Sequence, residues 1–135
     1  MALRYLLDTN ICIYIAKHHP PKVAQRFAQL SPGTVGMSVI TFGELRYGAE
    51  KSKRRDEALA TLIRLNELIP VIELNADVGA AYGSIRLHLK RAGSPIGNND
   101  LWLAAHAHSL GVTLVSNNMR EFERVPTLAL ENWAK

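Results

Sequence analysis

A short apolar run that ends in an acid, Tyr5-Leu6-Leu7-Asp8, is followed directly by Thr9 and Asn10. Three large apolar residues in a row are typical of a strand that is buried on both faces of a parallel sheet. Asp, Thr and Asn side chains favour the N-cap of a helix, and here they predict a helix that continues to residue 17. The segment therefore predicts a buried strand that passes straight into a helix, with Asp8 at the junction.

The same alternation continues along the rest of the chain. Further strands are predicted at residues 35–39, 71–74 and 112–116, with a short fifth at 128–130. Helices are predicted at 21–30, around 42–47, from 56 to about 65, at 76–91 and at 98–110, where Asn98 caps the last and Gly111 ends it. Strands that are separated by helices pair in parallel through right-handed crossovers. We expect a three-layer α/β domain with a central parallel sheet of four to five strands flanked by helices.

Composition narrows the class of protein. Cys12 is the only cysteine, so an internal disulfide and a multi-cysteine zinc site are excluded, and we expect a cytoplasmic protein. The apolar runs are too short to cross a membrane, so no membrane partner is expected. The net charge of +4 permits a nucleic-acid partner without requiring one. Basic residues gather at positions 51–55 and again at Arg86, Lys90 and Arg91, where a solvated turn and helix face are the simpler interpretation.

Acidic residues recur at one end of the predicted sheet. Asp8 follows the first strand, Glu44 lies in the helix after the second, and Asp100 lies in the first turn of the helix after a glycine-containing loop. The segment Ser116-Asn117-Asn118-Met119-Arg120-Glu121 follows the fourth strand. Ligands of open parallel sheets bind beyond the carboxyl ends of the strands. The acids are therefore predicted to meet at a ligand-binding edge.

Carboxylates that converge raise one another's pKa, and a divalent cation relieves that repulsion. Ligands that are all oxygen favour Mg²⁺ or Mn²⁺ over zinc. Taken singly, Asp8 and Asp100 are also explained as a helix cap and a first-turn acid. Glu44 is harder to explain in this way because apolar residues surround it. His106 and His108, two apart on a helix, do not form a zinc pair and are interpreted as surface or partly buried residues.

Four ordered motifs carry a resemblance to a known family. They are Leu6-Leu7-Asp8-Thr9-Asn10, Gly43-Glu44-Leu45-Arg46-Tyr47-Gly48, Ile96-Gly97-Asn98-Asn99-Asp100 with Ala104-Ala105-His106-Ala107, and Ser116-Asn117-Asn118-Met119-Arg120-Glu121-Phe122. Together they resemble the PIN-domain ribonuclease toxins called VapC, over the whole of residues 1–135 taken as one domain. Two departures stand out: Asn98-Asn99 lies where relatives often have proline, and Asn117-Asn118 lies where many PIN domains have an aspartate.

The resemblance implies a Mg²⁺-dependent endoribonuclease, with Mn²⁺ as a substitute, that acts as the toxin of a type II toxin–antitoxin pair. Its expected partners are a VapB-like antitoxin, a second copy in a homodimer, and a structured RNA such as tRNA. The proposed site then has three groups of residues. Asp8, Glu44 and Asp100 hold the metal and act in catalysis with Glu121; Ser116, Asn118 and Asn10 position water or phosphate; Lys51, Lys53, Arg54 and Arg55 steer RNA. A DNA-directed metal nuclease and a non-enzymatic α/β binding module remain as alternatives.

Overall fold

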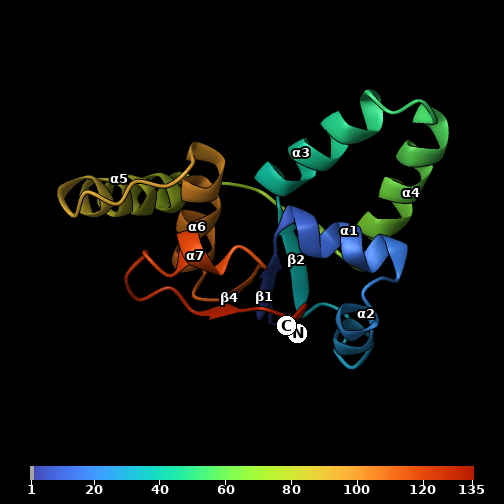
Figure 1. Ribbon diagram of the computed structural model, residues 1–135, viewed down its shortest axis with the longest axis horizontal. Helices are drawn as coiled ribbons and strands as arrows, with labels where there is room; N and C mark the ends of the chain where they lie inside the picture. The colour runs from blue at the N-terminus through green and yellow to red at the C-terminus, as the bar shows by residue number, and fades with distance from the viewer. Residues whose placement is uncertain (1) are drawn as a thin grey trace.

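The computed structural model describes residues 2–135, which form a twisted parallel sheet with helices on both faces (Figure 1). The strands are β1 (Tyr5–Leu7), β2 (Val35–Ser38), β3 (Val71–Ile72), β4 (Thr113–Val115) and β5 (Leu130–Glu131), in the spatial order β3-β2-β1-β4-β5. The helices are α1 (Thr9–Lys17), α2 (Pro21–Ala28), α3 (Val39–Glu50), α4 (Arg55–Leu68), α5 (Ala76–Arg91), α6 (Asn98–Leu110) and α7 (Met119–Phe122). The predicted α/β class with a five-stranded sheet is confirmed.

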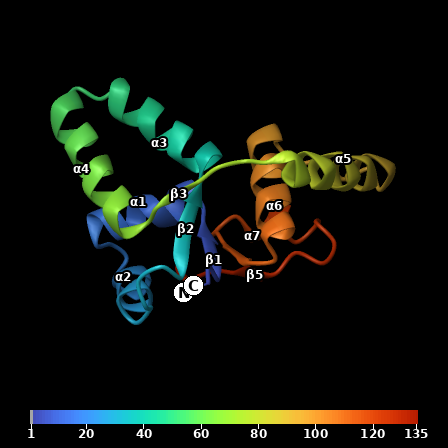
Figure 2. The ribbon, with the colours of Figure 1, turned by 180° about the vertical axis from the view of Figure 1, so that it is seen from behind.

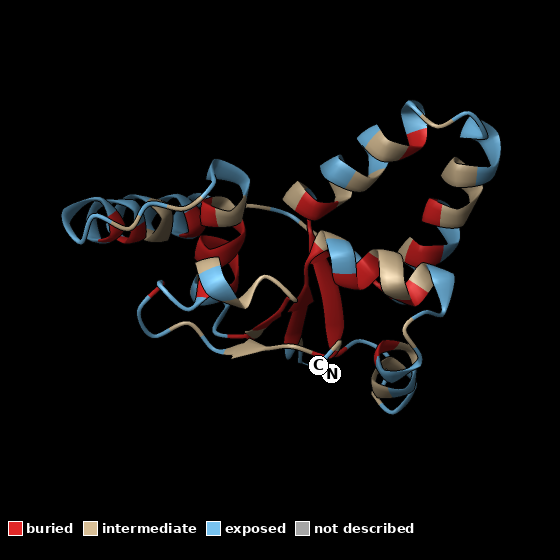
Figure 3. Ribbon diagram, viewed as in Figure 1, coloured by how far each residue is buried: buried red, intermediate tan, exposed pale blue. Residues whose placement is uncertain are grey.

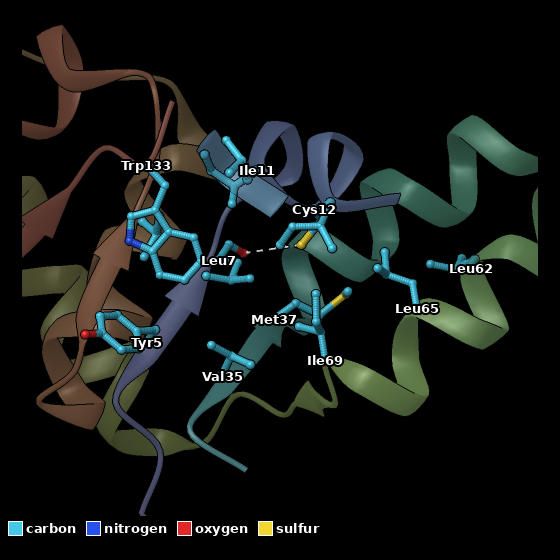
Figure 4. Close-up of a cluster of buried hydrophobic side chains, with 13 residues drawn as sticks. Tyr5, Leu7, Ile11, Cys12, Val35, Met37, Leu62, Leu65, Ile69 and Trp133 are labelled. Atoms are coloured by element: carbon cyan, nitrogen blue, oxygen red, sulfur yellow. Dashed lines mark hydrogen bonds between the residues drawn. The ribbon is translucent and has the colours of Figure 1, made fainter. Parts of the chain in front are cut away.

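The central strand β1 is buried on both sides, as its three apolar residues predict. Tyr5 and Leu7 pack into one hydrophobic cluster, and Leu6 packs into another on the opposite face. Figure 4 shows the first cluster, where Leu7 lies next to Cys12 of α1 and the edge of Trp133 meets the ring of Tyr5, with 5.5 Å between ring centroids. Figure 3 shows that burial is densest along β1 and β2. The strand therefore fixes α1 rigidly against the sheet.

Several element boundaries differ from the prediction by one to a few residues. The third strand ends at Ile72, because it is an edge strand that pairs only with β2. The fifth strand is Leu130–Glu131 and is shifted toward the C-terminus. Asn98 is the first residue of α6, and the N-cap position belongs to Gly97. Gly111 ends α6 with a positive φ of 68°, as predicted for a glycine at that position.

The strand order places a topological switch point at β1. The chain runs from β1 outward to β2 and β3, and then returns to the other side of β1 to form β4 and β5. Two helical arms diverge from this point: the α3–α4 hairpin lies on one side, and α5 with α6 lies on the other (Figures 1 and 2). Open α/β sheets bind ligands beyond the strand ends at such a point. Within residues 2–135, no helix combines the length and hydropathy needed to span a membrane.

Candidate active site

Asp8 lies at the switch point, between the ends of β1 and β4. Its Oδ1 accepts the Ile11 N–H at 3.0 Å and caps α1, while its Oδ2 accepts a 2.5 Å hydrogen bond from the Ser116 hydroxyl. Only 7% of the residue is exposed. Burial raises the pKa of Asp8, and the nearby charge of Glu44 adds to the rise, although the two hydrogen bonds oppose it. Asp8 therefore caps its helix and also presents a buried, constrained carboxylate to the cleft.

Asn118 links the remaining acids to this centre. Its backbone N–H donates to Ser116 Oγ at 2.9 Å, so it belongs to the same network as Asp8. Its side-chain Nδ2 donates to Asp100 Oδ2 at 3.4 Å and to Glu121 Oε2 at 3.2 Å. Glu121 lies in the short helix α7, which begins directly after Asn118. The chain after β4 thus brings Asp8, Asp100 and Glu121 into one polar network.

Glu44 approaches from the other helical arm. It lies in the second turn of α3 and is exposed. Thr9 Oγ1 donates to Glu44 Oε1 at 3.1 Å, which ties the start of α1 to α3. α3 begins directly at the end of β2 because Ser38 is both the last residue of the strand and the cap of the helix. This junction between β2 and α3 therefore sets the position of the exposed Glu44 carboxylate.

The pKa values record how closely the acids approach one another. Burial and a hydrogen bond with Glu121, together with the charges of Glu121, Glu44 and Asp8, raise the pKa of Asp100 to about 7. The same hydrogen bond to Asp100 lowers the pKa of Glu121. Near neutral pH, the Asp100–Glu121 pair therefore holds one shared proton for part of the time. This is the repulsion expected of carboxylates gathered at one site.

The donor set suits a hard cation. The polar network holds carboxylate, amide and hydroxyl oxygens, and these are the ligands that Mg²⁺ and Mn²⁺ favour. Among residues 2–135, no three acidic, histidine or cysteine side chains form a ready-made metal-binding group. The residues that would hold a cation are Asp8, Asp100 and Glu44, with Glu121 beside them. Their chemistry and mutual repulsion fit a divalent ion.

Two site residues were not predicted from the sequence. Asn117 Nδ2 donates to the Tyr14 hydroxyl at 2.9 Å, and Asn10 Nδ2 donates to Asn117 Oδ1 at 3.3 Å. Tyr14 lies one helical turn after Asn10 on α1, so it shares the face that borders the cleft. The i, i+4 spacing from Asn10 could have indicated that Tyr14 faces the site. An aromatic residue in an apolar helix is, however, first interpreted as part of the hydrophobic core. The predicted site residue Asn10 is thus held by Asn117.

The predicted steering residues Lys51, Lys53, Arg54 and Arg55 lie elsewhere. They lie in the turn between α3 and α4 and at the first residue of α4, Arg55, at the outer end of the hairpin in Figure 1. Arg55 Nε lies 2.6 Å from Glu50 Oε1, and an Arg54 nitrogen lies 3.6 Å from Glu57 Oε2. Part of the basic charge of this turn is therefore paired with neighbouring acids.

His106 is fully buried, so the interpretation of it as a surface or partly buried residue was wrong. Its Nδ1 lies 2.8 Å from Ser38 Oγ, which also accepts the Ile40 N–H that caps α3. Within residues 2–135, Nε2 has no hydrogen-bond partner, and the backbone of Glu73 lies close to the ring. Burial lowers the pKa of His106, and the Glu73 backbone opposes this only in part. The neutral ring joins α6, which carries Asp100, to the start of α3, which carries Glu44.

We expect the free energy of unfolding to fall, through His106, as the pH drops below about 6.5. That is the ordinary pKa of histidine in an unfolded chain. The folded pKa is lower, so the unfolded state takes up the proton first and the stabilisation is lost toward the folded pKa, with a slope of up to about 1.4 kcal/mol per pH unit. Urea unfolding from pH 5 to 8 measures this. His106→Asn should remove that part of the slope, and identical slopes in both proteins would contradict it.

Comparison with known proteins identifies the family. The PIN domain model matches residues 5–128. Ribonuclease VapC2 of Haemophilus influenzae Rd is 44% identical over 131 residues, 97% of this chain and 98% of that protein. The tRNA(fMet)-specific endonuclease VapC of Shigella flexneri is 42% identical over 132 residues, 98% of this chain and 99% of that protein. A chain in the VapBC-1 structure from nontypeable H. influenzae superposes with a TM-score of 0.90 at 40% identity, with both chains fully covered. The protein belongs to the VapC ribonucleases of the PIN-domain family.

Proposed function

We propose that this ribonuclease is a Mg²⁺-dependent endonuclease and the toxin of a type II toxin–antitoxin pair. The observation that carries the proposal is the convergence of Asp8, Asp100, Glu44 and Glu121 at the switch point, with the pKa of Asp100 raised to about 7. PIN-domain nucleases are generally metal-dependent. A bound Mg²⁺ would supply charge neutralisation at the phosphate and lower the pKa of a bound water. Mn²⁺ is expected to substitute.

Each residue of the site has its own role in this proposal. Asp8, held by Ser116 and the Ile11 N–H, offers a carboxylate whose direction is fixed before substrate arrives. Asp100 can take up a proton near neutral pH, because burial and the neighbouring carboxylates raise its pKa to about 7, while the hydrogen bond to Asp100 keeps the pKa of Glu121 low. The Asn118 amide and Asn10 stand ready to hydrogen-bond a water or a phosphate oxygen. Residues 1–135 act as one PIN domain.

The partners follow from the family. The relative in S. flexneri is named for cleavage of tRNA(fMet), and we propose a structured RNA such as tRNA as the substrate here. A VapB-like antitoxin neutralises the enzyme in the cytoplasm. The α3–α4 hairpin supports a protein partner because Tyr47, Ile63 and Leu68 are each more than half exposed. A homodimer is also part of the proposal, and light scattering of the purified chain tests it.

The deciding experiment is cleavage of tRNA(fMet) by the purified chain in Mg²⁺, in Mn²⁺ and in EDTA. A DNA hairpin of the same sequence is the control, since it lacks the 2′-hydroxyl. We expect internal cuts in RNA that require the metal. Cleavage that survives EDTA would refute metal dependence, and equal cutting of the DNA hairpin would favour a general nuclease.

Glu121→Gln is expected to reduce cleavage about 10–100-fold without abolishing it. Glu121 contacts the site through hydrogen bonds with Asp100 and Asn118. The loss of a residue that hydrogen-bonds to a metal ligand typically lowers activity by about 10–100-fold. High Mn²⁺ should restore part of the loss. The measurement is single-turnover cleavage against metal concentration. Parent rates at limiting metal would exclude Glu121 from the site.

Replacing Lys51, Lys53, Arg54 and Arg55 with glutamine is expected to weaken RNA binding equally for all sequences. The dependence of log K on log [salt] should flatten by about one unit for each lost phosphate contact. Because Arg54 and Arg55 are paired with acids, the two lysines should account for most of the change. Filter binding from 50 to 200 mM salt measures it. Equal salt slopes for parent and variant would show that these residues form a solvated turn and do not contact RNA.

A further inference from the structure

A second basic region lies between α5 and the start of α6. A hollow of about 310 Å³ opens there, beneath the loop of residues 92–97. Its charged and polar side chains are Arg86, Lys90 and Asn98, and its apolar lining includes Leu89, Ile96 and Leu101. No acidic residue lines this hollow, so its electrostatic potential favours an anion.

Arg86 is held in place before any ligand arrives. Its Nη1 donates to the Tyr82 hydroxyl at 2.7 Å, and its guanidinium lies 5.7 Å from the centre of the Tyr82 ring. The Tyr82 ring stacks on Trp102 with 3.8 Å between centroids, and its hydroxyl donates to Asn98 Oδ1 at 2.8 Å. A guanidinium that is fixed in this way loses less conformational entropy when it binds a phosphate.

The charge of Arg86 and Lys90 is uncompensated. Within residues 2–135, neither side chain takes part in an ion pair, whereas Arg54 and Arg55 are both paired with acids. Lys90 lies in the last turn of α5, where a cation also stabilises the helix dipole. Arg86 lies a full turn earlier, where that explanation is weaker. A free, oriented cation remains available for a ligand.

The hollow adjoins the acidic cleft. Asn98 lines it and is the first residue of α6, while Asp100 follows two residues later, about 3 Å along the helix axis. Figure 1 shows that α5 extends outward from α6 on this side of the sheet and that the following loop leads back to the start of α6. A polyanion brought to four carboxylates needs cationic contacts close by, because the acids repel its other phosphates.

We propose that Arg86 and Lys90 form a subsite for a backbone phosphate of the RNA, next to the phosphate that is cut. The proposal rests on the function proposed above and adds the register in which RNA crosses the site. One strand passes from the acidic cleft over the start of α6 to the hollow. The subsite contributes to binding and leaves the chemical step to the acids.

The test uses tRNA(fMet) and the variants Arg86→Gln and Lys90→Gln. In an inactive Asp8→Asn background, each should weaken binding about tenfold, as expected for a lost charge-assisted hydrogen bond, and lower the salt slope by about one. In the active chain, KM should rise with kcat within twofold. Arg91→Gln is the matched control, because it removes the same charge from the same helix outside the hollow. It should leave KM unchanged.

Tyr82→Phe tests the pre-organisation of Arg86 separately. The variant keeps the ring that stacks on Trp102 but removes the hydroxyl that holds Arg86 and Asn98. Binding should weaken about fivefold, which is less than for Arg86→Gln, because the charge stays and only the hydrogen bonds that orient it are lost. A rise in KM no larger than that of Arg91→Gln would overturn this part of the proposal.

The outcomes separate the subsite from the proposed function. Parent-like binding and KM in Arg86→Gln and Lys90→Gln would overturn the subsite while the parent still cuts RNA. Equal weakening by Arg91→Gln would also overturn it, since diffuse charge would then explain the effect. A parent chain that binds RNA with these salt slopes but does not cut it would refute the proposed activity and leave the subsite standing.

Discussion

Replacing Asp8 with asparagine is expected to lower RNA cleavage roughly a thousandfold or more, which corresponds to about 4 kcal/mol of transition-state stabilisation. Asparagine retains the Oδ1 that accepts the Ile11 N–H, and the Ser116 hydroxyl can turn to accept from its amide. Only the charge is lost. Because burial raises the pKa of Asp8, the ionised form opposes folding, and the variant should be at least as stable as the parent.

The measurement pairs single-turnover cleavage with the free energy of unfolding of the same preparation. Asp77→Asn is the matched control: it removes one acid from the first turn of α5, outside the polar network. It should keep parent activity. If Asp8→Asn instead unfolds the protein while the folded fraction still cuts RNA, Asp8 is a helix cap and nothing more.

The fold could be predicted from the sequence because its signals are local. Tyr5-Leu6-Leu7 alternates between two hydrophobic clusters, and Gly111 adopts the left-handed conformation that its place after α6 requires. The edge strands were predicted less well. β3 and β5 each have two residues, and their ends depend on pairing with β2 and β4, which no local pattern records.

The acids of the site could also be placed, since each follows a strand or begins a helix at the same edge. The hydrogen bonds that connect the site residues could not be predicted. Asn118 joins Asp100 to Glu121, Asn117 joins Asn10 to Tyr14, and His106 joins α6 to Ser38. Apart from the local contact between Asn118 and Glu121, these contacts join elements that are far apart in the chain. An amide or a buried histidine carries no periodic signal, so only the three-dimensional structure identifies its partner.

Asp100→Asn is expected to abolish cleavage and to remove most of the stabilisation that metal gives the folded protein. The pKa of Asp100 is raised to about 7 by burial, by its hydrogen bond with Glu121 and by the charges of Glu121, Glu44 and Asp8, so at pH 8 its charge opposes folding in the absence of metal. The neutral amide removes that repulsion. Without Mg²⁺ the variant should therefore melt at a higher temperature than the parent.

Millimolar Mg²⁺ should then raise the melting temperature of the parent and leave Asp100→Asn nearly unchanged. A ligand that binds only the folded state stabilises it by RT ln(1 + [L]/Kd), about 2.7 kcal/mol at a hundredfold excess over Kd. The variant loses a proposed ligand and so loses most of this gain. Scanning calorimetry of both proteins, first with EDTA and then with about 10 mM Mg²⁺, should show the two melting temperatures approach or cross. A melting temperature of the parent that does not change with Mg²⁺ would contradict a metal held by these acids. The repulsion that raises the pKa of Asp100 would then have no cation to relieve it.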